Sequence, residues 1–299
     1  MINGYYVLKS GEDFVASSKN VITTNGYLMM NKYLANSTQD WSAGIAIGVL
    51  NRNSASASDT ALEYEIARYP VTLKSYRTIS GSNQILLKAT VDPTLSASIT
   101  EIGVFPSIVI GKDQYIVSDF SESSNSINTW TASGSTSSLQ FAPYSRYGAS
   151  NTFFFASNSF LVNNNISFDM SQYVYTDYAD LLIYTPASSS GTFQISFGDV
   201  NGNIWRSGSG TASISGAGYY SVKMPLSGSY NSSFNYSINS VSISFLTTST
   251  ASLHFDALKF ISGDVKPETL KLTSRSIFST PIAKIANQPM QLEYYMQVT

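Results

Sequence analysis

The chain has 299 residues, of which 12% are charged and 13% aromatic, and its formal net charge is −2. That length allows one large or two medium domains, either with a real core. The sequence lacks cysteine, a basic cluster and any apolar run near the roughly 18 residues of a membrane span, which argues against disulfides, thiolate metal sites, nucleic-acid binding and membrane insertion.

The first 117 residues are predicted to form mainly strands. Residues 1–19 indicate an extended arm, and the only helix that we predict runs from about Asn25 to Leu34, where Thr and Asn cap candidates precede a short helical pattern. Further strands are expected at 85–91 and 99–105, which are rich in β-branched residues. A low charge content with many Tyr and Phe residues also favours an all-β fold.

The central block differs in composition from both of its flanks. Residues 119–260 hold 11 charged side chains in 142 positions, about 8%, against 25 in the remaining 157, about 16%. A composition that changes and then changes back indicates a domain inserted into a loop of another. We therefore predict a discontinuous β-rich base formed by 1–117 and 262–299, and an inserted domain at 118–261.

The inserted block is predicted to be a jelly-roll β-sandwich. Nine or so short strands are separated by Gly, Ser and Asn turns at near-regular spacing. Asn201-Gly202 is expected to form a two-residue hairpin turn. Insertion requires the two ends of a domain to lie close together, so we expect its first and last strands to be neighbours.

The C-terminal segment returns to the composition of the base. Residues 290–298 alternate with period 2, and Leu292, Tyr294, Met296 and Val298 share one face of the predicted strand. Because sheet edges pair across chains, we expect the two end segments, 1–19 and 290–299, to add strands to neighbouring subunits.

Six phrases in the base carry a family resemblance: Asn20-Val-Ile-Thr-Thr-Asn-Gly26, Ile45-Ala-Ile-Gly48, Ala61-Leu-Glu-Tyr-Glu-Ile-Ala-Arg68, Ile99-Thr-Glu-Ile-Gly-Val-Phe105, Ser274-Arg-Ser-Ile-Phe-Ser-Thr-Pro-Ile282 and Leu292-Glu-Tyr-Tyr-Met-Gln-Val298. They resemble a family of tailed-bacteriophage virion proteins, although Val104 stands where that family usually has Leu. The resemblance covers about 20–105 and 270–299 and implies a virion structural role without a position on the particle.

The inserted block opens with Asp119-Phe-Ser-Glu122 and closes with Phe255-Asp-Ala-Leu-Lys-Phe260. These segments resemble the first and last strands of jelly-roll carbohydrate-binding modules, with Glu122 displaced by one residue. The resemblance implies that a calcium ion ties these strands together, with Asp119, Glu122 and Asp256 as ligands. The alternative is that these acids are merely solvated.

Sugar binding needs exposed aromatic faces beside hydrogen-bonding groups. The alternative for each candidate is a place in the core, since alternating aromatics fill a sandwich, as we expect for Trp130 and most Phe residues. The candidate aromatic residues are Trp205, Tyr144, Tyr147, Tyr175, Tyr178 and Tyr230.

Catalysis is not predicted. His254 is the only histidine, it lies in a strand pattern beside Phe255, and no metalloprotease, nucleotide-binding or serine-hydrolase motif occurs. A carboxylate pair for glycoside cleavage stays open, since sequence does not reveal separations. The nearest cluster comprises Asp169, Asp177 and Asp180.

The leading hypothesis is a non-enzymatic virion structural protein, made in the host cytoplasm and displayed on the virion surface. It decorates or cements the capsid, contacts major capsid proteins, and projects a module that binds host or environmental glycans. A tail, neck or baseplate adhesin that contacts tail proteins and host-surface glycans is the first alternative. A free lectin, a polysaccharide depolymerase and an inert spacer are the others. The resemblance implies a homotrimer.

Overall fold

The structure is a computed structural model of the whole chain, and it is all-β apart from one α-helix and one short 3-10 helix among the described residues. This confirms the predicted fold class. The residues that the structure describes are 2–37, 40–79, 81–118, 120, 130–133, 139–142, 146–147, 150–155, 160–187, 189–206, 210–214, 216–228, 232–246 and 251–298.

The chain forms two compact units, which we call the base and the central unit. The base comprises residues 1–111 and 265–299, and the central unit comprises residues 112–264. No helix in the described part of either unit has the length and apolar character needed to cross a membrane.

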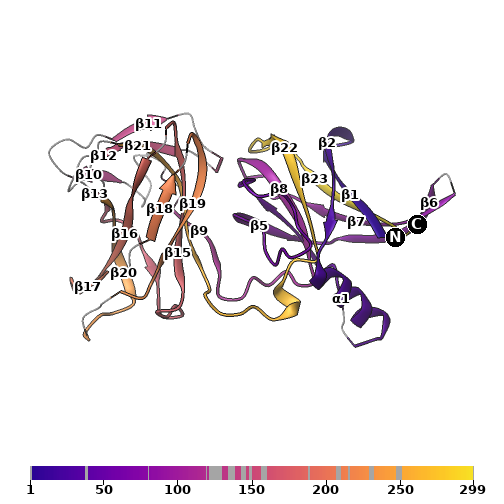
Figure 1. Cartoon of the computed structure of the whole chain (residues 1–299), viewed down its shortest axis with the longest axis horizontal. Coiled ribbons are helices and arrows are strands. Elements are labelled where there is room, and N and C mark those ends of the chain that lie inside the picture. The colour runs from indigo at the N-terminus through magenta and orange to yellow at the C-terminus, as the bar shows by residue number, and fades with distance from the viewer. Residues whose placement is uncertain are drawn as a thin grey trace. The chain divides into compact units, whose positions relative to one another are not determined.

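The base contains two five-stranded antiparallel sheets (Figure 1). Sheet A has the order β2-β1-β23-β7-β6, and sheet B has the order β3-β22-β8-β4-β5. The strands of sheet A are β1 (Ile2–Ser10), β2 (Asp13–Lys19), β6 (Leu73–Ile79), β7 (Ser82–Thr90) and β23 (Gln291–Val298). Those of sheet B are β3 (Val21–Ile22), β4 (Gly44–Gly48), β5 (Glu65–Pro70), β8 (Ala97–Phe105) and β22 (Ser274–Lys284).

The end segments of the chain pair with each other. Strand β23 lies between β1 and β7, with Tyr6 opposite Tyr294 and Leu87 opposite Tyr294 on its other side. Strand β22 pairs with β3 and β8. The expectation that both ends add strands to neighbouring subunits is therefore wrong for β1 and β23, whose backbone groups are used on both sides within sheet A. For β2, which lies at the edge of the sheet, it stays a prediction.

The predicted helix is present as α1 (Thr24–Leu34), followed much later by the 3-10 helix η1 (Glu268–Leu270). The side chain of Thr23 accepts a hydrogen bond from the backbone N–H of Gly26 at 3.0 Å, so it is the N-cap. The hydroxyl of Thr23 also donates to the carbonyl of Leu272 at 2.6 Å. The cap therefore starts the helix and joins it to the C-terminal segment.

The central unit is a sandwich of two antiparallel sheets. Sheet C has the order β11-β12-β21-β15-β19 with β9 beside β21, and sheet D has the order β10-β13-β20-β16-β17 with β14 and β18 attached. Sheet C contains β9 (Gln114–Ser118), β11 (Leu139–Ala142), β12 (Ser150–Phe155), β15 (Tyr178–Thr185), β19 (Gly218–Pro225) and β21 (Ala251–Ile261). Sheet D contains β10 (Thr131–Ser133), β13 (Phe160–Asn163), β14 (Phe168–Asp169), β16 (Ser189–Asp199), β17 (Ile204–Arg206), β18 (Gly210–Ile214) and β20 (Ser237–Leu246).

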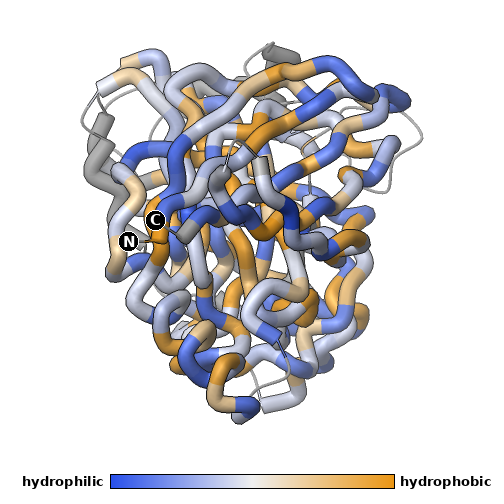
Figure 2. Tube along the Cα trace, turned by 90° about the vertical axis from the view of Figure 1, so that its right-hand side faces the viewer, coloured by the Kyte–Doolittle hydropathy of each residue, from blue (hydrophilic) through white to orange (hydrophobic). Residues whose placement is uncertain are grey.

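From β19 to β21 successive strands alternate between sheets C and D, as they also do from β12 to β13 and from β15 to β16, an arrangement typical of a jelly roll. Apolar and polar residues alternate along the strands, which Figure 2 shows as a change of colour along the trace. The core between the sheets is rich in aromatic rings: Phe120 stacks on Trp130 at 4.6 Å, and Phe193 contacts Phe245 at 4.6 Å. These side chains are buried, as expected from the aromatic composition.

The two ends of the central unit are joined to each other. Strand β9, which begins before residue 118, pairs with β21, so the first and last strands are neighbours as expected. The ammonium of Lys112 lies 3.0 Å from the carboxylate of Asp177 and 2.9 Å from that of Asp264. Asp177 also accepts from the N–H of Gly263 at 2.9 Å, and a Cβ at Gly263 would lie 1.7 Å from the carbonyl of Thr176. Only glycine fits there.

The expected two-residue turn at Asn201-Gly202 is wrong. Residues 200–203 connect β16 and β17. The buried carboxylate of Asp199 organises this loop, because it accepts from the N–H groups of Asn201, Asn203 and Asn235 at 2.6 to 2.9 Å. The N–H of Gly202 also donates to the carbonyl of Asp199 at 3.0 Å, so the tight turn spans residues 199–202 with Val200 and Asn201 at its centre.

Candidate functional site

The outward face of sheet C carries the polar and aromatic residues of the candidate site. Side chains alternate between the two faces of a strand, and Leu181 and Ile183 on β15 and Val222 on β19 point into the core. Their neighbours therefore point away from the core. The outward set, from β15, β19 and β21, is Asp180, Tyr184, Tyr219, Ser221, His254 and Lys259.

Three rings form a row across three adjacent strands. The ring of Tyr184 on β15 lies between the ring of Tyr219 on β19, at 4.9 Å, and that of His254 on β21, at 5.3 Å. The register explains the row, because Tyr184 is directly opposite both Tyr219 and His254. The two tyrosine side chains are half-buried, so part of each remains accessible.

A short segment from before β12 covers one end of this face. The backbone N–H groups of Arg146 and Tyr147 donate to the two carboxylate oxygens of Asp256, at 2.8 and 3.1 Å. The guanidinium carbon of Arg146 lies 4.1 Å from the centre of the Tyr219 ring. Asp256 is fully buried and faces a register shift between β15 and β21, a feature frequent beside binding sites. Arg146 is thereby held against the row of rings.

Charged groups extend the face along the strands. Asp180 lies directly opposite Lys223 on β19 and Lys259 on β21, and its carboxylate accepts a hydrogen bond from the hydroxyl of Ser221. Asp180 and Lys259 are buried, whereas Lys223 is exposed. The face therefore combines ring surfaces with hydrogen-bond donors and acceptors of both charges.

Burial sets the protonation states on this face. It raises the pKa of Tyr219 to about 12, with the negative charge of Asp256 acting in the same direction, so the phenol keeps its proton and can donate. Burial also lowers the pKa of His254 below its ordinary 6.5. The imidazole is therefore neutral at pH 7 and has both a donor and an acceptor nitrogen.

The residues predicted from sequence occupy different places. Trp205 is 2% exposed, its Nε1 donates to the carbonyl of Gly228 at 3.3 Å, and its ring meets Phe234 edge to face. It fills the core and presents no ring face to a ligand. Tyr147 borders the candidate face through Asp256. Tyr175 is 70% exposed in the turn before β15.

Tyr178 begins β15 and shares the outward side with Asp180, so it lies at the far end of the face from Tyr184. Tyr144, Tyr230, Asp119 and Glu122 lie outside the described residues. Within the described ranges no group of three His, Cys, Asp or Glu residues could hold a metal ion. The calcium site stays a prediction, and the carboxylate of its third proposed ligand, Asp256, is bonded by two backbone N–H groups.

Sequence reasoning missed Tyr184, Tyr219, His254, Arg146 and Asp180 as members of one site. Alternation within each strand could have placed the first three away from the core. Nothing in the sequence indicated that β15, β19 and β21 are neighbours, because strand pairing between distant segments leaves no local signal.

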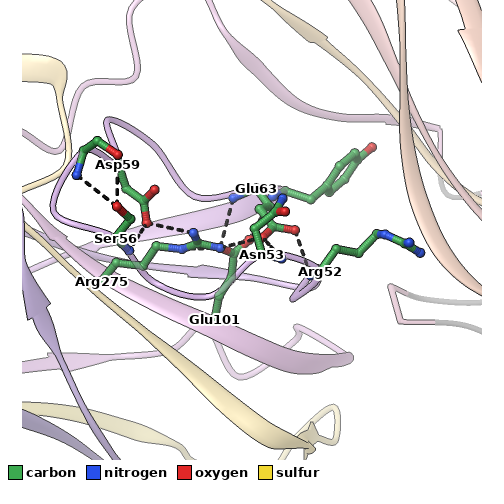
Figure 3. A network of polar contacts seen from close by, with 9 residues as sticks. Arg52, Asn53, Ser56, Asp59, Glu63, Glu101 and Arg275 are labelled. Atoms are coloured by element: carbon green, nitrogen blue, oxygen red, sulfur yellow. Dashed lines mark hydrogen bonds and ion pairs between the residues drawn. The ribbon is translucent and has the colours of Figure 1, made fainter.

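A second polar cluster, in the base, joins several of the sequence phrases quoted above (Figure 3). The buried guanidinium of Arg275 lies 2.8 Å from Asp59, 2.9 Å from Glu63 and 3.0 Å from Glu101. Glu101 also accepts from the N–H groups of Glu63 and Tyr64, at 2.9 and 2.8 Å.

Glycine is required next to this cluster at Gly48, where a Cβ would lie 2.4 Å from a Glu101 carboxylate oxygen. The phrases around residues 45–48, 61–68, 99–105 and 274–282 therefore meet at one buried network of charges. That network accounts for them as packing motifs and supplies no accessible chemistry.

Comparison with known proteins gives neighbours only among solved structures; no family model and no curated protein matches the chain. A family 11 carbohydrate-binding module of the Clostridium thermocellum cellulase Lic26A-Cel5E is similar to 52% of this chain over 96% of its own length, with 16% identity and a TM-score of 0.35. An exo-beta-agarase aligns with 52% of the chain at 11% identity and a TM-score of 0.37. The CBM22-1-GH10 modules of Clostridium thermocellum xylanase 10B align with 50% at 12% identity and 0.32. The aligned parts span 25% and 28% of these last two proteins.

Proposed function

We propose that the central unit binds glycans through the outward face of sheet C. The observation that carries the proposal is the row of Tyr219, Tyr184 and His254 across three adjacent strands, flanked by charged and hydroxyl groups. The function is binding without catalysis.

The chemistry of a sugar fits this face. A pyranose ring has an apolar C–H surface and a rim of hydroxyl groups, so it needs a ring to pack on and donors and acceptors beside it. The tyrosine rings supply the surface on which the apolar face of a sugar packs. The half-buried phenol of Tyr219 and hydroxyl of Ser221 supply the hydrogen-bonding groups, whereas His254 (6% exposed) and Asp180 (1% exposed) are buried behind them.

The test is a glycan array probed with the full chain and with the double variant Tyr184→Ala/Tyr219→Ala. A lost ring contact of about 0.5–1.5 kcal/mol lowers affinity about two- to tenfold per ring. Tyr175→Ala is the matched control, since this ring is exposed but lies in a turn off the face. Equal loss in the control, or unchanged binding by the double variant, would reject the face as the site.

A calcium ion near the first and last strands of the central unit is a further part of the proposal, supported by the sequence resemblance alone. Addition of calcium to metal-free protein should raise the unfolding temperature of the central unit if the ion binds the folded state. Magnesium at the same concentration is the control. No difference between the two ions would remove calcium from the proposal.

A virion structural role is the second candidate, for capsid decoration or for a tail, neck or baseplate position. It is supported by the resemblance of the sequence phrases alone. Imaging and mass spectrometry of purified phage particles test it: hundreds of copies per particle indicate the capsid, a few indicate the tail, and none leaves a free lectin. Sedimentation of the isolated protein tests the homotrimer.

A further inference from the structure

The base has a polar pocket that none of the functions above uses. Its volume is about 590 Å³, within the usual range of roughly 300–1,000 Å³ for small-molecule sites. The lining includes Asn3 and Tyr5 of β1, Ser17 and Lys19 of β2, and Gln297 of β23. The residues that line the pocket thus carry amides, hydroxyls, one ammonium and one aromatic ring.

Tyr5 is the end member of a stack of planar groups. Its ring lies 4.8 Å from the ring of Tyr295 with only 12° between their planes, and the guanidinium of Arg77 lies 4.4 Å from the centre of the Tyr295 ring. Tyr295 is buried, whereas Tyr5 is half-buried. The stack holds the Tyr5 ring in a fixed orientation, which lowers the entropy lost when a ligand packs on it.

The open side of this stack faces the pocket. Strand β1 lies between β23 and β2, and Tyr5 is opposite Tyr295 on one side and Lys19 on the other. The ring face that Tyr295 does not cover is thus turned toward β2, whose residues 17–19 line the pocket. Asn3 and Gln297 are directly opposite each other, so their amides flank the same space.

We propose that this pocket binds one pyranose ring, which stacks on Tyr5 and is hydrogen-bonded by the surrounding amide, hydroxyl and ammonium groups. Amides and hydroxyls offer both donors and acceptors, which matches the dual character of sugar hydroxyls. The site is separate from the face of sheet C and does not depend on it. It gives the base a sugar contact of its own.

The experiment uses saturation-transfer NMR on the full chain carrying Tyr184→Ala/Tyr219→Ala, so that the proposed site on sheet C does not contribute. The probes are the methyl glycosides of glucose, galactose and mannose, with adenosine as a stacking competitor of another class. At least one glycoside should show transfer to its ring C–H protons. Transfer to adenosine alone, or to none of the probes, would overturn the proposal.

Two variants test whether the saturation transfer to a glycoside comes from this pocket. Tyr5→Ala should weaken binding about two- to tenfold, the range of one aromatic contact. Ser17→Trp should abolish it by filling the pocket from an exposed position, where the fold tolerates a large side chain. Phe14→Ala, on the same strand but outside the lining, is the control and should bind normally. Undiminished binding by Ser17→Trp, with an unchanged unfolding temperature, would place the sugar elsewhere.

Discussion

The base and the central unit surround their buried charges with different partners. In the base, Arg275 is surrounded by three carboxylates, and the buried carboxylate of Glu293 lies 2.6 Å from Lys88 and 3.2 Å from Lys9. In the central unit the buried carboxylates of Asp199 and Asp256 accept from backbone N–H groups, and a large cluster of aliphatic and aromatic side chains fills the space between the sheets. Charge content along the sequence is therefore no guide to burial. Among the described residues, the buried charged side chains are Glu101, Arg275, Lys284 and Glu293 in the base, and Asp177, Asp180, Asp199, Asp256 and Lys259 in the central unit.

This difference predicts different sensitivities. An aromatic core is stabilised by non-directional burial, so its losses scale with the removed volume. A buried ion-pair network is stabilised only while every charge is compensated, and one missing partner leaves another charge stranded in a low dielectric. The variants below test this contrast, and hydrogen exchange with mass spectrometry reads the two units separately.

Arg275→Ala should have the largest effect. It removes the only guanidinium shown beside the fully buried Glu101, and breaking a buried pair in this way costs about 3–5 kcal/mol in the free energy of unfolding. Exchange should accelerate in peptides from β8 and β22 and stay normal in the central unit. Arg52→Ala is the control, because Arg52 contributes its backbone N–H to Glu63 while its side chain points away from Arg275 (Figure 3). Equal effects of both variants would contradict the network.

Leu181→Ala tests the other kind of core. The side chain is fully buried within the sandwich cluster, and leaving its space empty should cost about 2–5 kcal/mol in the central unit alone. Thr192→Ala, on a half-buried position of β16, should cost far less. Loss of protection in β1 or β23 as well would show that the two units do not unfold independently.

The fold was more predictable from sequence than the candidate site, and these two cores show why. Local signals sufficed for α1, where Thr23 caps a short apolar pattern, and for β23, whose alternation is regular. Arg275 looked like any strand residue, because its three carboxylate partners lie 174 to 216 positions earlier. Trp205 was mistaken for a ligand contact because an aromatic residue beside a turn has the same local sequence whether its ring is buried or exposed.

Lys284→Met removes another buried cation of the base and should lower the free energy of unfolding by less than Arg275→Ala does. Its buried ammonium donates to the carbonyls of Pro93, Leu95 and Ile285 at 3.2, 3.1 and 2.8 Å, and methionine would leave these acceptors unsatisfied. The expected cost is about 1–3 kcal/mol in the base. Lys223→Met, an exposed lysine of the central unit, should stay within about 0.5 kcal/mol by urea unfolding. If Lys284→Met lowers the free energy of unfolding no more than Lys223→Met does, the buried hydrogen bonds of Lys284 do not stabilise the base.

The pH dependence of the central unit should be the smallest effect. Burial lowers the pKa of His254 in the folded protein, so the unfolded chain, with a histidine pKa near 6.5, takes up a proton first as the pH falls. Stability from this group is therefore complete above about pH 6.5 and declines below it. Urea midpoints measured between pH 8 and 5.5 should fall in the wild type more than in His254→Asn. Parallel curves for the two proteins would mean that the His254 imidazole is as well solvated in the folded protein as in the unfolded chain. In that case the fold would not hold this imidazole in its neutral form.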